Sequence, residues 1–348
     1  MRVSAALLAA ALAIAPLTAG AQGFAGLGTA ADGFADPDPA HDIVFPADHG
    51  AHDRFRIEWW YLTANLTDAS GNAYGVQWTL FRMGLRPPGQ DGPGPDAAWM
   101  GHAALTSRDR HRVAERMARG GTGQAHVTTA PFAAVIDEWS LAGNPATTLS
   151  VHAAGPDFAY QLDLAVTGPP VLQGQRGFSI KSAGGQASHY YSLPFLTASG
   201  TLLLDGDQIP VTGAAWIDRE WSSQPLAEDQ QGWDWFSLRL SGGARLMAFR
   251  LRDSDGGAFL SGTWIAPDGR PTPIAPGELS IAPLAPVAPA AGTPTRWQIR
   301  LPGHGVDVEI DALNPRARMN LSFPYWEGPV SVSGSHDGNG YLEMTGYE

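Results

Sequence analysis

Hydrophobic and polar residues alternate along most of the chain. The alternation is clear in the runs FAYQLDLAVTG, TLLLDGDQIPVTGAAWID, ARLMAFRLRDSDG and VDVEIDAL. Because successive side chains of a β-strand point to opposite faces of a sheet, a period of two predicts strands with one buried face. Residues that favour turns, such as Gly, Asp, Asn and Pro, separate the runs. The pattern therefore predicts an all-β chain with little helix.

The strongest hairpin signal is RFRIEWWYLTANLTDASGNAYGVQWTLFRM. Its two apolar-rich runs are separated by turn-forming residues around Gly71. In the first run we expect four side chains on one face of the strand: Phe55, Ile57, Trp59 and Tyr61. A single segment, SRDRHRVAERMARG from Ser107 to Gly120, is predicted to be helical.

The aromatic hairpin pattern occurs a second time. The runs EWWYLTANL and GVQWTLFR resemble WDWFSLRL and LMAFRLR, which suggests two related β-domains in tandem. The polar stretch from Ser222 to Gly232 is the predicted boundary between an N-terminal domain at residues 45–224 and a C-terminal domain at residues 230–348. The Pro/Ala-rich segment from Ala266 to Thr295 is expected to be a long surface loop with one or two short strands.

Residues 1–21 have the pattern of a signal peptide. Arg2 precedes an apolar run that is too short to span a membrane, and Ala19-Gly20-Ala21 resembles a cleavage site. The chain has 0 cysteines, so it lacks the residue to which a lipid anchor would be attached. We expect a soluble, periplasmic or secreted protein that begins near Gln22 with an extended or mobile leader over residues 22–44.

The charge and the missing motifs narrow the function. The formal net charge is −12, with 34 acidic and 22 basic residues, which argues against nucleic acid or an anionic membrane surface as the main partner. The chain has no G-x-S-x-G, H-E-x-x-H, P-loop or dinucleotide motif. Serine hydrolases, zinc proteases and nucleotide-dependent enzymes are poor matches, and we expect no cofactor.

The stretch AAWIDREWSSQ, from Ala214 to Gln224, places charged residues between two tryptophans. As a strand it would carry three residues on each face: Trp216, Asp218 and Glu220 on one, Ile217, Arg219 and Trp221 on the other. Charged groups beside large apolar groups lose hydration at a high cost unless they are paired or take part in chemistry. Two interpretations follow.

The first interpretation is an ion-pair clasp, in which Arg219 or another arginine binds Asp218 or Glu220 and the tryptophans pack in the core. In the second, one of the two acids points into an apolar cavity, where desolvation keeps it protonated near neutral pH. A protonated acid in a dry pocket can give its proton to an alkene. Glu58, beside two tryptophans, and Asp234, between two others, repeat the arrangement of a carboxylate among indoles.

Two further groups of polar residues are candidates for binding. The run HDIVFPADHGAHDRF offers residue types that bind divalent metals: His41, Asp42, Asp48, His49, His52 and Asp53. Their spacing matches no metal motif, and we expect solvated side chains on the approach to the first strand and no metal. In ASHYYSLPF, His189 and the adjacent Tyr190 and Tyr191 lie near a strand end, where one hydroxyl could face a pocket.

Three blocks carry a family resemblance. RIEWWYLTANL near the start, GAAWIDREW in the middle, and YWEGPVSVSG with GNGYLEMTGY at the end resemble the carotenoid 1,2-hydratase and AttH-like superfamily of two-domain lipocalin-like proteins. The resemblance implies two tandem β-barrel domains of the calycin type and a pocket for a hydrophobic ligand. Carotenoid hydratases of this superfamily add water to an isoprenoid double bond without a cofactor, through protonation and capture of the carbocation by water.

Most of the predicted site lies in the matching blocks, and Tyr191, Asp234 and Trp235 are added from outside them. We expect Asp218 to be the acid, with Glu220 as the second choice. Aromatic faces would stabilise a cation, and the predicted ligand-binding residues are Glu58, Trp59, Trp60, Tyr61, Tyr191, Trp216, Arg219, Trp221, Asp234 and Trp235.

Three functions remain open from the sequence. The leading hypothesis is an exported lipocalin-like protein that binds an isoprenoid or lipid and hydrates it by acid catalysis. The rival is a carrier without chemistry that works with an ABC-type export system, as the resemblance to AttH implies. A third is a sugar-processing β-protein with two carboxylates and aromatic platforms. An enzyme needs a pocket carboxylate without an arginine partner, whereas a carrier should have every acid clasped.

Overall fold

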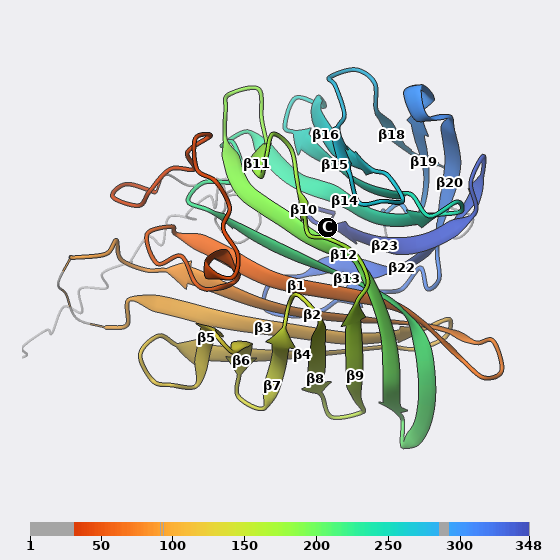
Figure 1. Cartoon of the computed structure of the whole chain (residues 1–348), viewed down its shortest axis with the longest axis horizontal. Coiled ribbons are helices and arrows are strands. Elements are labelled where there is room, and N and C mark those ends of the chain that lie inside the picture. The colour runs from red at the N-terminus through yellow and green to blue at the C-terminus, as the bar shows by residue number, and fades with distance from the viewer. Residues whose placement is uncertain (1–30, 91, 93, 285–291, 348) are drawn as a thin grey trace, which may run out of the picture.

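The computed structural model describes residues 31–90, 92, 94–284 and 292–347, and they form two antiparallel sheets (Figure 1). The predicted signal peptide lies outside the described residues. The first sheet contains, in spatial order, β4 (His111–Arg119), β3 (Ala97–Ser107), β2 (Ala73–Gly84), β1 (Ile57–Asp68), β13 (Asp207–Ser222), β12 (Ala187–Leu204), β9 (Phe158–Val166), β8 (Thr148–Ala154), β7 (Trp139–Asn144), β6 (Phe132–Ile136) and β5 (Ala125–Thr129), with β10 (Val171–Leu172) and β11 (Phe178–Ile180) beside β12.

The second sheet contains, in spatial order, β17 (Pro271–Pro273), β16 (Ala258–Ile265), β15 (Arg245–Asp253), β14 (Gln230–Leu240), β23 (Gly338–Met344), β22 (Tyr325–Gly334), β20 (Val306–Ala312), β19 (Arg296–Leu301) and β18 (Ser280–Pro283), with β21 (Arg318–Met319) beside β22. In the described part of the chain, helix is limited to two 3-10 turns, η2 (Ala47–His49) and η3 (Pro302–His304). These near-barrel sheets confirm the predicted all-β fold of tandem lipocalin-like domains.

The two sheets share one topology. In each sheet the first strand lies between the second strand and the last: β1 between β2 and β13, and β14 between β15 and β23. The hairpins β1–β2 and β14–β15 are the two segments whose sequences resemble each other. The first sheet ends with β13 and the second begins with β14, on either side of the polar stretch proposed as the boundary.

The helix predicted from Ser107 to Gly120 is wrong. The segment is a turn followed by β4, which pairs with β3. On the face of β4 that packs against the first core, Ala114 and Ala118 are buried and Arg116 lies over the Trp139 ring. Small and charged residues at these core positions hide the period of two, and pairing with β3 outweighs the local preference for helix.

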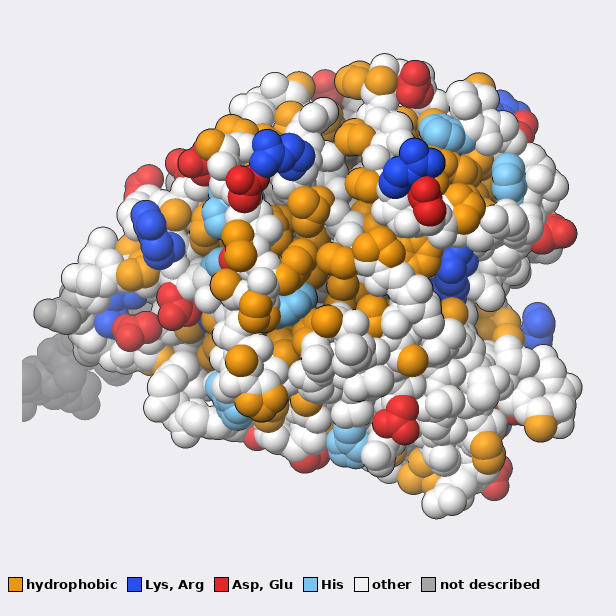
Figure 2. Space-filling model, in the orientation of Figure 1, with side chains coloured by type: hydrophobic (Ala, Val, Ile, Leu, Met, Phe, Trp, Pro, Cys, Tyr) orange, Lys and Arg blue, Asp and Glu red, His pale blue; other side chains and the backbone are white. Residues whose placement is uncertain are grey.

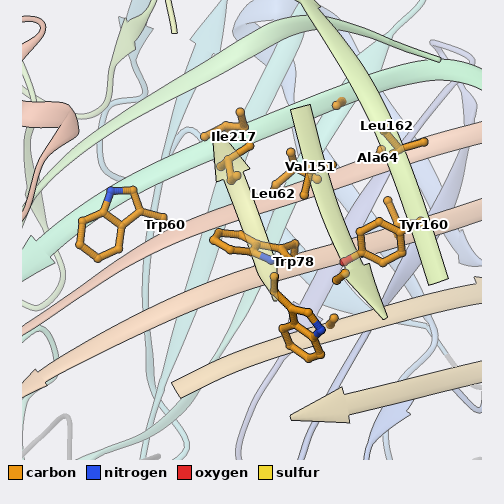
Figure 3. Close-up of a cluster of buried hydrophobic side chains, with 14 of the residues drawn as sticks. Trp60, Leu62, Ala64, Trp78, Val151, Tyr160, Leu162 and Ile217 are labelled. Carbon is orange, nitrogen blue, oxygen red and sulfur yellow. The ribbon is translucent and has the colours of Figure 1, made fainter. Parts of the chain in front are cut away.

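The core of the first sheet is built around large aromatic side chains. Trp60, Leu62 and Ala64 point inward from β1 toward Trp78 and residues of the strands opposite (Figure 3). Each fully buried large apolar side chain contributes roughly 1.5–3 kcal/mol to folding. The preceding Phe55 packs against this same cluster, not with Ile57 as predicted, because it lies before β1 begins.

A third apolar cluster joins the sheets, where side chains of β1, β12 and β13 pack against side chains of β14 and β15. Strands β1 and β2 also contact β23 and β22. Ile57 and Tyr61 pack in this cluster with residues of the second sheet such as Trp235 and Phe249. Close approach is possible because Gly75 has no side chain: a Cβ there would lie 2.6 Å from the Cγ atom of Pro329. Hydrophobic side chains gather in the middle of the face shown in Figure 2, over the region where the sheets meet.

Candidate active site between the two sheets

Strand β13 separates its charged residues by face, as the alternation predicts. Asp218 and Glu220 point toward the second sheet and line a cavity. Arg219 and Trp221 point to the other side, where the Arg219 guanidinium lies 3.9 Å from the centroid of the Trp60 ring. The strand is in the middle of the first sheet, with Tyr61 of β1 directly opposite Asp218. One strand thus serves two different polar environments.

The cavity lies between the sheets and has a volume of about 90 Å³. Strands β1, β2, β12 and β13 supply one wall, and β14, β15 and β23 supply the other. Half of its 14 lining residues are aromatic, and the full set is Trp59, Tyr61, Phe81, Lys181, Tyr190, Asp218, Glu220, Pro225, Leu226, Trp233, Trp235, Phe249, Leu251 and Glu343. Both domains therefore share one pocket.

Asp218 is a buried carboxyl group with only uncharged hydrogen-bond partners. Trp216 Nε1 donates to Oδ1 at 2.7 Å, the Tyr190 hydroxyl donates to Oδ2 at 2.9 Å, and Ser192 also bonds Oδ1. The structure records no ion pair for Asp218 among the described residues. Burial raises its pKa to about 7, against the lowering effect of these three donors. The clasp interpretation therefore fails for Asp218.

Glu220 has a different environment although it lines the same cavity. Its Oε1 atom lies 2.8 Å from Lys181 Nζ, and Ser188 bonds the same oxygen. Lys181 in turn lies over the rings of Tyr190 and Phe249, at 4.9 and 4.4 Å from their centroids. Glu220 is therefore held by a cation and a hydroxyl group, unlike Asp218.

A third carboxyl group, Glu343 of β23, enters the cavity from the second sheet. Trp233 Nε1 donates to its Oε1 atom at 2.7 Å. Burial raises the pKa of Glu343 to about 7, and the nearby Asp218 and Glu220 add to the increase. The cavity therefore holds two carboxyl groups, Asp218 and Glu343, that can exchange protons near neutral pH.

The opposite face of β13 holds a buried ion-pair cluster. Arg219 binds Glu58 and donates to the backbone oxygen of Gly50 at 2.6 Å, and Arg82 binds the other oxygen of Glu58. Burial alone would raise the pKa of Glu58, but Arg219, His52 and Arg82 hold it well below its ordinary value. Arg219 is thus committed to Glu58 and is not available to either cavity acid.

The segment before β1 completes this cluster, and our expectation that its side chains are solvated is wrong for three of them. Asp48 and His49 are buried, and His52 stacks on Trp221 with ring centroids 4.0 Å apart. His52 Nε2 lies 3.1 Å from Asp48 Oδ1, and His49 Nδ1 lies 2.6 Å from the Tyr191 hydroxyl. Among the described residues, no group of three or more His, Asp or Glu side chains is placed to hold a metal ion.

The structure divides the predicted site residues into three groups. Asp218, Glu220, Trp59, Tyr61 and Trp235 line the cavity, and Trp216 packs beside it as a donor to Asp218. On the far side of the sheet lie Glu58, Trp60, Tyr191, Arg219 and Trp221. Asp234 is paired with Arg252 and Arg250 away from the cavity.

Sequence reasoning missed several lining residues. It selected Tyr191 from two adjacent tyrosines, but Tyr190 is the one that lines the cavity. Tyr191 lies on the other face of the sheet, because neighbours on a strand point to opposite faces. No local sequence pattern marked Lys181 as a lining residue. For Glu343 the one available hint was its position between aromatic and apolar residues in the block GNGYLEMTGY, on a predicted strand.

Comparison with known proteins agrees with this architecture. The model of the AttH-like family matches residues 36–347. The chain belongs to the AttH-like family. A crystal structure of an AttH-type protein from Nitrosomonas europaea is 32% identical, with a TM-score of 0.81, and the match covers 90% of this chain and 100% of that one.

A more distant neighbour shares the fold of this AttH-like chain. The crystal structure of kievitone hydratase from Nectria haematococca has a TM-score of 0.65 and 15% identity, over 90% of this chain and 96% of that one. No protein of curated function matches the chain. The family match confirms the AttH-like resemblance seen in the sequence, and the hydratase structure confirms the lipocalin-like fold.

We predict that Glu58→Gln destabilises the protein by about 3–5 kcal/mol, because Arg219 would remain buried without its counter-charge. Urea unfolding at neutral pH measures this loss. Since the folded pKa of Glu58 is lowered, its contribution is present above the ordinary glutamate pKa of 4.5 and is lost as the pH falls. The gap between parent and variant should therefore narrow in acid.

Asp268→Asn is the matched control, since Asp268 pairs with Arg270 at the exposed surface. Its unfolding curve should overlay that of the parent. A Glu58→Gln protein as stable as the parent at neutral pH would contradict the role assigned to the cluster.

Proposed function

We propose that this AttH-like protein binds a hydrophobic alkene, of the isoprenoid or lipid class, in the cavity between its sheets and adds water to the double bond. The observation that carries the proposal is Asp218, a buried cavity carboxyl with three uncharged donors and no ion-pair partner in the described part of the chain. Such a group is protonated over a pH range in which ordinary aspartates are ionised. The fold also occurs in a protein named as a hydratase.

The proposed reaction begins with proton transfer from the Asp218 carboxyl to one alkene carbon. The π electrons form the new C–H bond, Asp218 becomes a carboxylate, and the other carbon becomes a carbocation. The faces of Trp59, Trp233 and Trp235 surround the cavity and can stabilise this charge. Water then forms a C–O bond, and its extra proton passes to a cavity carboxylate, either Asp218 or Glu343. The sum is alkene plus water to alcohol.

The surroundings of Asp218 favour this chemistry over simple binding. A carrier for a neutral lipophile gains nothing from two buried carboxyl groups without cations, because each costs free energy when it is ionised. Glu220 takes no proton-donating role in the proposal, because it forms an ion pair with Lys181. Its charge instead offsets that of Lys181, so that the ammonium group does not repel the carbocation.

We predict that Asp218→Asn lowers the hydration rate by roughly 10²-fold or more while ligand binding is retained, since the amide keeps the shape but has no transferable proton. Farnesol and detergent-dispersed lycopene are suitable probes, with incorporation of oxygen from isotopically labelled water detected by mass spectrometry. In the parent, the rate should fall as the pH rises through about 7, where Asp218 loses its proton.

Asp307→Asn, at an exposed ion pair of the second sheet, should retain the parent rate. If parent and Asp218→Asn both return every probe unchanged, and lipids that co-purify with the protein are unmodified, the carrier hypothesis replaces hydration. In that case the ligand would be handed to an ABC-type export system.

We also propose that the protein is exported and cleaved after Ala21, on the evidence of the signal-like residues 1–21. N-terminal sequencing of protein from the periplasmic or extracellular fraction should begin near Gln22. Exported protein that still begins at Met1 would contradict cleavage.

A further inference from the structure

A chain of titratable side chains runs from the cavity wall toward the surface. Tyr61, which lines the cavity, donates to Glu327 Oε1. Tyr325 lies on the same strand as Glu327 and acts on the same carboxyl group, whose buried Oε2 atom has no hydrogen-bond partner among the described residues. The Tyr325 hydroxyl lies 3.0 Å from His102 Nδ1, and His102 Nε2 lies 3.1 Å from Glu115 Oε1. Each link joins two groups that can both accept and release a proton.

The side chains of this route are buried, except at its outer end. The exposed fractions of Tyr61, His102, Tyr325 and Glu327 are between 0% and 4%. The Glu115 side chain is 19% exposed and reaches solvent. The route crosses the contact between the sheets twice, because Tyr61, His102 and Glu115 belong to the first sheet and Tyr325 and Glu327 to the second.

The middle of the chain holds a carboxyl group that carries a proton. Glu327 of β22 lies directly opposite Glu343 of β23. Two opposed carboxylates in a buried site cannot both be ionised without strong repulsion. Burial, together with Glu343, raises the pKa of Glu327 well above its ordinary value. An apolar pair would fill this position at lower cost, so stability alone gives no reason for the carboxyl group.

We propose that Glu115, His102, Tyr325, Glu327 and Tyr61 form a proton relay that connects bulk solvent with the cavity. The relay would set the protonation of the cavity carboxyls while a hydrophobic ligand excludes water. It rests on the proposed function only for the use of that proton.

One inward transfer moves a proton from Glu115 to the cavity. Glu115 gives a proton to His102 Nε2, and His102 releases the proton on Nδ1 to the Tyr325 oxygen. Tyr325 passes its own hydroxyl proton to Glu327, and Glu327 passes its proton to the Tyr61 oxygen. Tyr61 then releases its original hydroxyl proton to a water or carboxylate in the cavity. The inner groups end with the proton count they started with, Glu115 has lost one proton and the cavity has gained one.

The test is the hydrogen–deuterium exchange of the Glu327 carboxyl, which needs no substrate. The protein at pH 6 is mixed with deuterated buffer, and the carbonyl band of the protonated acid is followed by infrared spectroscopy, with Glu327→Gln used to assign the band. The single variants Tyr61→Phe and His102→Gln each close one end of the route. The double variant should exchange at least about tenfold more slowly than the parent, and more slowly than either single variant.

His189→Gln is the matched control, because His189 is buried like His102, with 2% of it exposed, but it is not part of the proposed relay. Its ring packs with Trp221. It should exchange like the parent. If His102→Gln fails to fold, Tyr325→Phe interrupts the same half of the route. A double variant that exchanges as fast as the parent would overturn the relay, since Glu327 would then exchange through local opening. The relay also fails if His102→Gln alone leaves the exchange rate of Glu327 unchanged and Tyr61→Phe alone slows it as much as the double variant does.

Discussion

The ion pair between Arg219 and Glu58 determines what the neighbouring residues of β13 can do. Arg219 lies next to Asp218 in the sequence, but alternation places it on the opposite face, where Glu58 and the oxygen of Gly50 hold it. The Arg219 guanidinium is therefore unavailable to the cavity. Asp218 is left with neutral donors, and burial raises its pKa to about 7, so it keeps its proton at pH values at which an ordinary aspartate is ionised. A structural ion pair on one side of the sheet thus creates an acid on the other.

The cavity depends on both sheets. The first sheet supplies Asp218 and Tyr190, whereas the second supplies Trp233, Trp235 and Glu343. Neither sheet alone could desolvate Asp218, since β14 and β15 cover it. Trp235 Nε1 donates to the Tyr190 hydroxyl at 3.1 Å, and that hydroxyl donates to Asp218. A hydrogen-bond chain from the second sheet therefore orients the proposed acid, so relative movement of the sheets would disturb its protonation.

The sequence predicted the fold and five of the 14 cavity-lining residues. The physical reasons for these successes also explain the failures. The period of two identified the strands and separated Asp218 from Arg219 correctly. It failed at β4, where Ala114 and Arg116 occupy core-facing positions. Between the adjacent tyrosines it gave no means of choosing Tyr190, because both are buried and the face that lines the cavity depends on partners far away in the chain.

The polar contacts of the site were least accessible from the sequence. Glu58, Lys181 and Glu343 are separated from their partners Arg219, Glu220 and Trp233 by 39 to 161 residues. No local pattern reports such pairings, which arise only when β1, β23 and the segment between β11 and β12 are brought to β13 and β14. The segment before β1 was misjudged for the same reason: His49 and His52 find buried partners on β12 and β13.

The protonation state of Asp218 tests the account most directly. Protein labelled with carbon-13 at aspartate carboxyl groups can be titrated by NMR, with the Asp218 signal assigned through Asp218→Asn. We predict a midpoint near pH 7 for this one signal. A midpoint near the ordinary value of 3.8 would show that Asp218 is ionised at neutral pH and would contradict its role as the acid.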